Sequence, residues 1–280
     1  MCFIKENVLF FRIYNGVFAL INLAFFVAGL VTFINVHDQW RPYYRIDLTH
    51  NQEMEVFPLY VSMIMHLMTT MFHIMFVIFA RSIVENSFRE KNSNPYRWFL
   101  QFIGEGTGLV GIMIIHGIAH IETLMVTMVV YGAVLILCYY QDEYLNTNYE
   151  FMPSKEPHFF AIPIYVLLIV FVSIKSTENI NGEFTTRVAI VSLISLFQTS
   201  MMFIIQRLHI RKNVGNQVVS AADDQEDDTG TSKMDPIDEN EAEVRRGIFY
   251  EILQYTNSSI FMGIVSWLII SVVRNDIVLN

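Results

Sequence analysis

Residues 122–140, ETLMVTMVVYGAVLILCYY, decide the fold because only one of these consecutive side chains, Glu122, is charged. A helix of roughly 17 to 25 apolar residues crosses a hydrocarbon core of about 30 Å, so the stretch predicts a transmembrane helix. The whole chain agrees, since 53% of its 280 residues are hydrophobic and 16% are charged. Soluble domains average about 45–50% apolar and about 25% charged residues, and the composition therefore argues against a water-soluble domain.

Further apolar runs of suitable length lie on both sides of this stretch. They cover residues 14–36, 57–80, 98–116, 158–174, 187–206 and 248–273. The run 158–174 is short and the run 98–116 contains Glu105, which makes these two spans the weakest. The first run is too long for a signal peptide and no small-residue cleavage site follows it. We expect an all-α, multi-pass integral membrane protein in which residues 1–280 form a single seven-helix domain.

The distribution of lysine and arginine predicts the orientation of this bundle. With the spans above, thirteen of these residues fall at the N-terminus and in the second, fourth and sixth loops, and five fall on the other side. Because cationic loops stay in the cytoplasm, the N-terminus is expected to be cytoplasmic and the C-terminus extracellular. This topology is inverted relative to G-protein-coupled receptors and ordinary microbial rhodopsins, and seven helices alone specify no function.

The net charge of −9 comes from one segment. Between Asp223 and Glu243 lie ten carboxylates and one lysine, so the rest of the chain is neutral. The surrounding loop, 213–244, has almost no large apolar residues and is expected to be a disordered cytoplasmic loop. It recruits a basic protein partner electrostatically, or is modified at Thr229, Thr231 or Ser232, or is a solvated spacer without a partner. The long polar loop 37–56 is expected on the extracellular side, where it can form a short hairpin.

Motifs for catalysis, metal binding and nucleic-acid binding are missing from the sequence. The two cysteines, Cys2 and Cys138, form neither a disulfide framework nor a zinc-ligand cluster. No phosphate loop, nucleophile elbow or HExxH pattern occurs. We therefore expect neither an enzyme nor a nucleic-acid-binding protein, and no bound metal.

Polar residues inside the third span share one helix side. They are spaced three or four residues apart: Gln101, Glu105, Gly108, Ile112 and His116. A second series, Gly104, Gly108 and Gly111, lets a neighbouring helix approach closely. The stripe has two interpretations, which are tight packing with a satisfied hydrogen bond from Glu105, or a functional proton or ligand site.

The second and seventh spans also carry polar side chains. His66 and His73 are two helical turns apart and face the same way, which is too far apart to bind one metal. Their two interpretations are separate interhelical hydrogen bonds or one buried polar network. In the seventh span a single stripe is expected to face the bundle interior; it comprises Glu251, Tyr255, Ser258, Met262 and Ser266.

Several short motifs along the chain also occur together in one known family of membrane proteins. The most specific is Asn94-Pro95-Tyr96-Arg97-Trp98; others are Arg12 with Asn15, Phe72-His73, and Glu251, Tyr255, Ser258 and Trp267 near the C-terminus. In these residues the chain resembles the heliorhodopsins, retinal proteins that lie inverted in the membrane. The resemblance implies a seven-helix rhodopsin-like fold. It also implies a homodimer, for which the sequence gives no other indication.

The same resemblance implies that the covalent pigment is lost. Retinal needs a lysine amine in the last span, but counting back from Trp267 by the family's Lys-x-x-x-x-Trp spacing reaches Met262, and none of the six lysines lies in that span. The family's counterion position holds Leu100, followed by Gln101. A buried cation without a carboxylate is very unfavourable, so the paired loss is physically consistent. Asn22 stands where the family has a histidine.

Three functions follow as hypotheses. The first is a sensory or regulatory membrane protein without a covalent chromophore, in which His73, Glu105, His116 and Glu251 communicate between helices. The second is a proton or cation pathway along Glu105, His116 and Glu251. The third is a non-covalent site for retinal or another lipid-like ligand, lined by Trp98, Met262 and Trp267.

Overall fold

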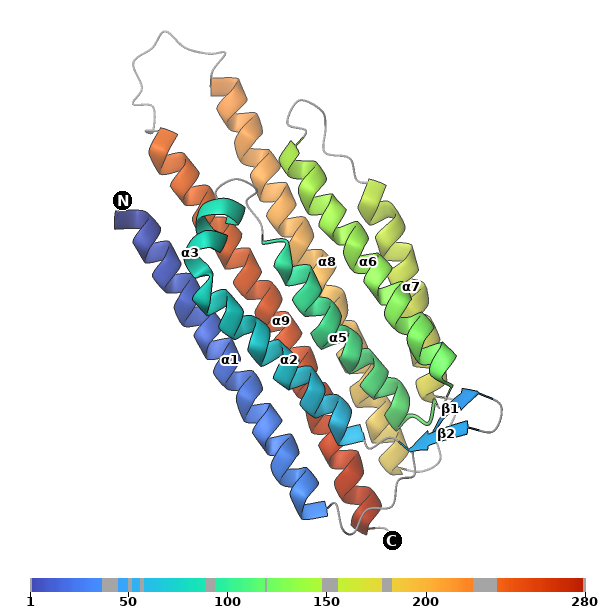
Figure 1. Ribbon diagram of the computed structural model, residues 1–280. Coiled ribbons are helices and arrows are strands. Elements are labelled where there is room, and N and C mark those ends of the chain that lie inside the picture. The colour runs from blue at the N-terminus through green and yellow to red at the C-terminus, as the bar shows by residue number, and fades with distance from the viewer. Residues whose placement is uncertain are drawn as a thin grey trace.

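The computed structural model describes residues 2–36, 45–49, 52–55, 58–88, 94–118, 120–147, 156–177, 183–223 and 236–278. Long helices make up most of this part of the chain (Figure 1). They are α1 (Cys2–Val36), α2 (Pro58–Ile78), α5 (Tyr96–Ile115), α6 (Ile121–Thr147), α7 (Glu156–Thr177), α8 (Glu183–Asp223) and α9 (Pro236–Val278). Short helix α3 (Ala80–Ser82) and π-helix η1 (Ile83–Phe88) follow α2.

Six of the long helices contain a stretch that is long and apolar enough to cross a membrane. Inside a bilayer no water satisfies the backbone, so a helix, which bonds its own N–H and C=O groups, is the favoured crossing structure. The chain is therefore a helical multi-pass membrane protein. The exception is α7, whose apolar part is shorter, Phe159–Ile174, and which contains Pro163 inside the helix.

The bundle is built around α5. This helix contacts α2, α6, α7 and α9, while α9 also packs against α1, α2 and α8. Figure 1 shows α1, α2 and α9 on one side of α5 and the pair α6 and α7 on the other. The described chain begins and finishes at opposite ends of the bundle; we call these the N-terminal end and the C-terminal end.

A two-stranded sheet lies between α1 and α2, in the loop where the sequence suggested a hairpin. Strands β1 (Arg45–Thr49) and β2 (Gln52–Glu55) are antiparallel, with Arg45 opposite Glu55 and an irregularity between Asp47 and Thr49. The sheet lies at the C-terminal end of the bundle (Figure 1).

Local signals set both ends of α5. At the start, the Asn94 side chain accepts a hydrogen bond from the Tyr96 backbone N–H at 3.1 Å, and Pro95 precedes the first helical residue. At the end, Gly117 has φ of 77°. The Gly117 N–H bonds the Ile114 carbonyl, and the Ile118 N–H bonds the Met113 carbonyl. This is the Schellman arrangement, which ends a helix at a glycine.

Helices α8 and α9 are longer than their apolar spans, at 41 and 43 residues. They extend into the acidic segment that was expected to be disordered from 213 to 244. The prediction is wrong for 213–223 and 236–244, which are helical, whereas 224–235 lies outside the described residues. The physical reason is that the nucleation cost is already met inside the bundle, so each further turn adds hydrogen bonds at little cost.

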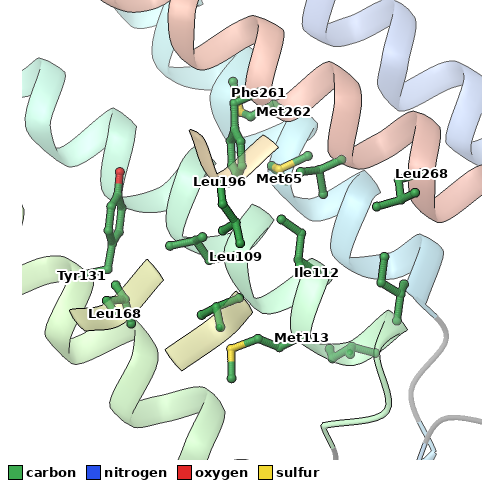
Figure 2. Packing of buried hydrophobic residues seen from close by; sticks show 14 of the residues in the cluster. Met65, Leu109, Ile112, Met113, Tyr131, Leu168, Leu196, Phe261, Met262 and Leu268 are labelled. Atoms are coloured by element: carbon green, nitrogen blue, oxygen red, sulfur yellow. The ribbon is translucent and has the colours of Figure 1, made fainter. Parts of the chain in front are cut away.

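Close packing around the glycines of α5 joins the central helices. A Cβ at Gly104 would lie 2.7 Å from the Met262 Sδ, and one at Gly108 would lie 2.6 Å from the Phe261 ring. A Cβ at Gly111 would meet Ile269 at 3.2 Å. These contacts confirm the close helix approach predicted from the glycine series, and they identify α9 as the neighbour. Figure 2 shows Phe261 and Met262 of α9 beside Met65 of α2 and the α5 residues Leu109 and Ile112.

Candidate functional site

The inward stripes of α5 and α9 face each other inside the bundle. On α5, Gln101 and Glu105 are both fully buried. On α9 the predicted interior residues are all buried: Glu251, Tyr255, Ser258, Met262 and Ser266. Because α5 and α9 pack directly against each other, the two stripes form polar contacts at successive turns.

The first cluster is centred on Glu105. The Tyr131 hydroxyl of α6 donates a hydrogen bond to the Glu105 Oε2 at 2.5 Å, and the Ser258 hydroxyl of α9 lies beside the same carboxyl group. The Glu105 Oε1 makes no hydrogen bond to the described residues. This carboxyl group therefore joins α5 to α6 and leaves one buried acceptor open.

One turn closer to the N-terminal end, a chain of amides links α5, α9 and α8. The Gln254 Nε2 donates to the Met202 carbonyl at 3.0 Å, and the Gln254 Oε1 accepts from the Gln101 Nε2 at 3.2 Å. This order of donors leaves the Gln101 Oε1 as a second buried acceptor with no partner in the described chain. Gln101 and Glu105 are four residues apart on one helix side, so the two open acceptors are on neighbouring turns.

The second cluster surrounds Glu251 on α9. The Asn94 Nδ2 donates to the Glu251 Oε1 at 2.8 Å, and the Tyr255 hydroxyl donates to the same oxygen. His73 on α2 meets the edge of the Tyr255 ring, with centroids 5.1 Å apart. His73, Tyr255, Glu251 and Asn94 thus form one continuous group across α2, α9 and the start of α5.

The third cluster contains a buried ion pair that the sequence reasoning did not identify. Arg97 on α5 pairs with Asp142 on α6, and their side chains are 1% and 6% exposed. The Trp98 Nε1 donates to the Asp142 Oδ2 at 3.1 Å, and the Gln206 Nε2 of α8 donates to the Oδ1 at 2.7 Å. The available signal was an arginine at the start of one span and an aspartate just beyond the apolar run of the next.

Two histidine contacts form a ladder between α1 and α2. The His73 Nδ1 hydrogen bonds the Asn15 Oδ1 at 2.9 Å, and the His66 Nδ1 hydrogen bonds the Asn22 Oδ1 at 2.8 Å. Phe18 stacks on His73 and Phe25 stacks on His66, with centroids 5.4 and 5.0 Å apart. These bonds confirm the interhelical role predicted for the two histidines. The asparagine partners were missed, although Asn15 and Asn22 have the same seven-residue spacing as the histidines.

Met262 occupies a tightly packed apolar position. It is 2% exposed, and its Sδ accepts a weak contact from the Thr69 hydroxyl at 3.6 Å. Gly104 approaches its sulfur from α5. Leu100, one turn before Gly104, is 3% exposed and belongs to a cluster with Ile252 and Tyr255. Apolar side chains therefore fill both of the positions that the sequence resemblance predicted as the former linkage and counterion sites.

Two of the predicted site residues lie elsewhere. Trp267 is 58% exposed on the outer face of α9, so the prediction that it lines an interior pocket with Trp98 and Met262 is wrong. A membrane helix has apolar side chains on its lipid-facing side as well as on its interior side. The sequence therefore does not show on which side an aromatic residue such as Trp267 lies. His116 at the end of α5 bonds the Ser192 hydroxyl of α8 at 2.9 Å. It is eleven residues from Glu105, about 16 Å along a helix, and does not join that carboxyl group.

Within the described residues, no three histidine, cysteine, aspartate or glutamate side chains gather closely enough to hold a metal ion. Comparison with known protein families and with curated proteins finds no match to this chain. The site consists of three polar clusters that involve α5 or α9 and are surrounded by apolar packing.

Proposed function

We propose that the protein is a heliorhodopsin-like regulatory or sensory membrane protein that forms no covalent retinal pigment. The observation that carries this proposal is the environment of Met262. A retinal linkage needs an amine at an interior position of the last helix, and α9 contains no lysine. At the position implied by the resemblance stands a thioether packed against Gly104 and Thr69.

An inverted seven-helix topology is part of the same proposal. The excess of lysine and arginine on one side favours a cytoplasmic N-terminus. The N-terminal and C-terminal ends of the described chain are on opposite sides of the bundle (Figure 1), as an odd number of crossings requires. The proposal takes α7 as the seventh crossing, because it packs alongside α6 and α8.

Regulation is assigned to α9 because its polar contacts reach three other helices. Ser266 bonds His66 of α2 at 2.6 Å, Gln254 bonds Gln101 of α5, and Asn257 accepts from Gln198 of α8 at 2.7 Å. A displacement of α9 has to exchange these bonds together, which is the property of a two-state element. The acidic segment between α8 and α9 connects directly to this helix and is the proposed contact for a basic cytoplasmic partner.

Reconstitution with retinal tests the proposal. The purified protein is mixed with all-trans retinal, and its absorption spectrum is recorded before and after hydroxylamine. We expect no visible band that hydroxylamine bleaches. In the variant Met262→Lys with Leu100→Glu, a bleachable band is expected, because an amine and a carboxylate then occupy the two interior positions. A pigment in the native protein overturns the loss of linkage, and a well-folded double variant without pigment contradicts the proposed alignment.

A proton or cation pathway is the second candidate function. It is favoured by the two open buried acceptors, the Glu105 Oε1 and the Gln101 Oε1, on neighbouring turns of the central helix. Hard cations and hydrogen-bond donors bind to such oxygen atoms. Voltage-clamp currents that are present in the native protein and lost in Glu105→Gln support this candidate. The absence of current at every pH in well-expressed, folded protein rejects it.

A further inference from the structure

An apolar groove lies on the outside of the bundle between α5 and α6. Its volume is about 570 Å³, within the roughly 300–1,000 Å³ of typical ligand sites. Its walls come from the first turns of α5 and the last turns of the α6 span. The lining residues are Pro95, Tyr96, Trp98, Phe99, Phe102, Gly132, Leu135, Ile136 and Tyr139.

The lining determines the chemistry of the occupant. Almost none of it is polar, and a ligand with a polar group inside the groove would lose hydrogen bonds to water without replacement. Tyr96, Phe99 and Ile136 at the groove are more than half exposed. Both helices are long and apolar enough to cross a membrane, so lipid is the expected medium outside this opening.

We propose that this groove binds one acyl chain of a bilayer phospholipid, with the lipid head group at the N-terminal end of the bundle. The head group is placed there because the groove begins at the first residues of α5. Tyr96 and Tyr140 are 59% and 56% exposed at that level, and tyrosines gather where a membrane helix meets the head-group region.

Gly132 keeps the groove open. A Cβ at this position would lie 3.0 Å from the Phe102 ring, so a larger side chain has to project into the space between the helices. The next residue, Ala133, is exposed and does not line the groove. The two positions form a matched pair for substitution on adjacent residues of one helix.

The groove also contacts the interior ion pair. The Trp98 ring lines the groove while its Nε1 donates to Asp142, and the Arg97 guanidinium lies 4.6 Å from the same ring. A chain in the groove therefore packs directly against the residue that holds Asp142 in place. This assignment is independent of the proposed function, because it involves neither Met262 nor retinal.

Fluorescence quenching by brominated lipids tests the site. The chain has three tryptophans, and the variant Trp40→Phe with Trp267→Phe leaves Trp98 alone. Trp98 is a lining residue of the groove and is otherwise buried by protein, so a brominated chain inside the groove lies closer to it than chains in the surrounding bilayer. In phosphatidylcholine vesicles with brominated chains, we expect strong quenching of Trp98. Bromine near the head group should quench more than bromine near the chain end.

Gly132→Leu in this single-tryptophan protein is expected to lose most of the quenching, and Ala133→Leu is expected to keep it. Circular dichroism establishes that both variants are folded. Equal quenching in the two variants, or no quenching in the parent, overturns the proposal. If Gly132→Leu does not fold, the depth series on the parent decides: quenching independent of bromine depth, or strongest at the chain end, also overturns it.

Discussion

Arg97 on α5 and Asp142 on α6 form an ion pair inside the bundle, and neither side chain is more than 6% exposed. Removing two charges from water costs several kcal/mol per ion, and the attraction between them offsets this only with further hydrogen bonds. Trp98 and Gln206 supply those bonds to both oxygens of Asp142. The pair therefore joins three helices, α5, α6 and α8.

Asp142→Leu is expected to lower the free energy of unfolding by about 3–5 kcal/mol, because the arginine charge is left buried without a partner. The double variant Arg97→Met with Asp142→Leu should recover most of that loss. Denaturant titration in detergent micelles measures both. The exposed pair Arg81 and Glu85 is the control, since Glu85→Ala should change stability by less than about 1 kcal/mol. A double variant as unstable as the single one would contradict the argument.

Gly108→Ala is expected to destabilise the bundle by about 1–3 kcal/mol through overpacking. The added methyl group would lie 2.6 Å from the Phe261 ring, which is fully buried and cannot move into solvent. Gly16→Ala on α1 is the matched control, because nothing lies within 4 Å of its Cβ position. The control should be neutral or stabilising, since alanine favours a helix by up to about 1 kcal/mol over glycine. Thermal unfolding of both variants decides, and equal effects would be evidence against the tight α5–α9 contact.

A double-mutant cycle on Asn15 and His73 should give a favourable coupling energy of about 0.6–2 kcal/mol, the range for hydrogen bonds between membrane helices. The crossed pair Asn15 and His66 is the control. These two residues belong to different rungs, about 10 Å apart along the helix, and their effects should add. A coupling in the crossed pair as large as in the direct pair would show that the ladder does not consist of two separate bonds.

Met262→Leu is expected to cost less than about 1.5 kcal/mol, because it conserves volume in an apolar site. Met262→Lys should be clearly less stable without retinal, because the Met262 side chain is only 2% exposed and a charged amine there would be buried in apolar packing. Adding Leu100→Glu should restore part of the loss: Leu100 is one turn before Gly104, which contacts Met262. Unfolding free energies of the three variants provide the measurement, and a fully stable Met262→Lys protein would contradict the described packing.

Hydropathy was sufficient to locate the helices, because membrane helices are long and apolar and make their backbone hydrogen bonds internally. It did not locate their ends. The apolar window of the sixth predicted span closes at 206, whereas α8 continues to Asp223, since helix formation depends on propagation and not on contact with lipid. The acidic composition of the loop therefore predicted disorder where the structure has helix.

Spacing on one helix predicted which side faces inward, as for Glu105, Ser258 and Met262. It could not predict partners on other helices, because these depend on how two helices are rotated and shifted relative to each other. Asn15 therefore appeared only as part of a motif, and Asp142 was not considered. The prediction that Trp267 lines an interior pocket was wrong for a related reason, because an aromatic side chain is equally favourable on the lipid-facing side of a helix.

Helices α8 and α9 run for 41 and 43 residues, which at 1.5 Å per residue is about 60 Å and twice the thickness of a hydrocarbon core. They pack against each other, and their far ends project beyond the other helices (Figure 1). On the proposed function, a partner bound to these projecting ends would act on the interior from a distance. A sideways force on them would tilt the segment of α9 that holds Gln254 and Met262, without the partner entering the membrane.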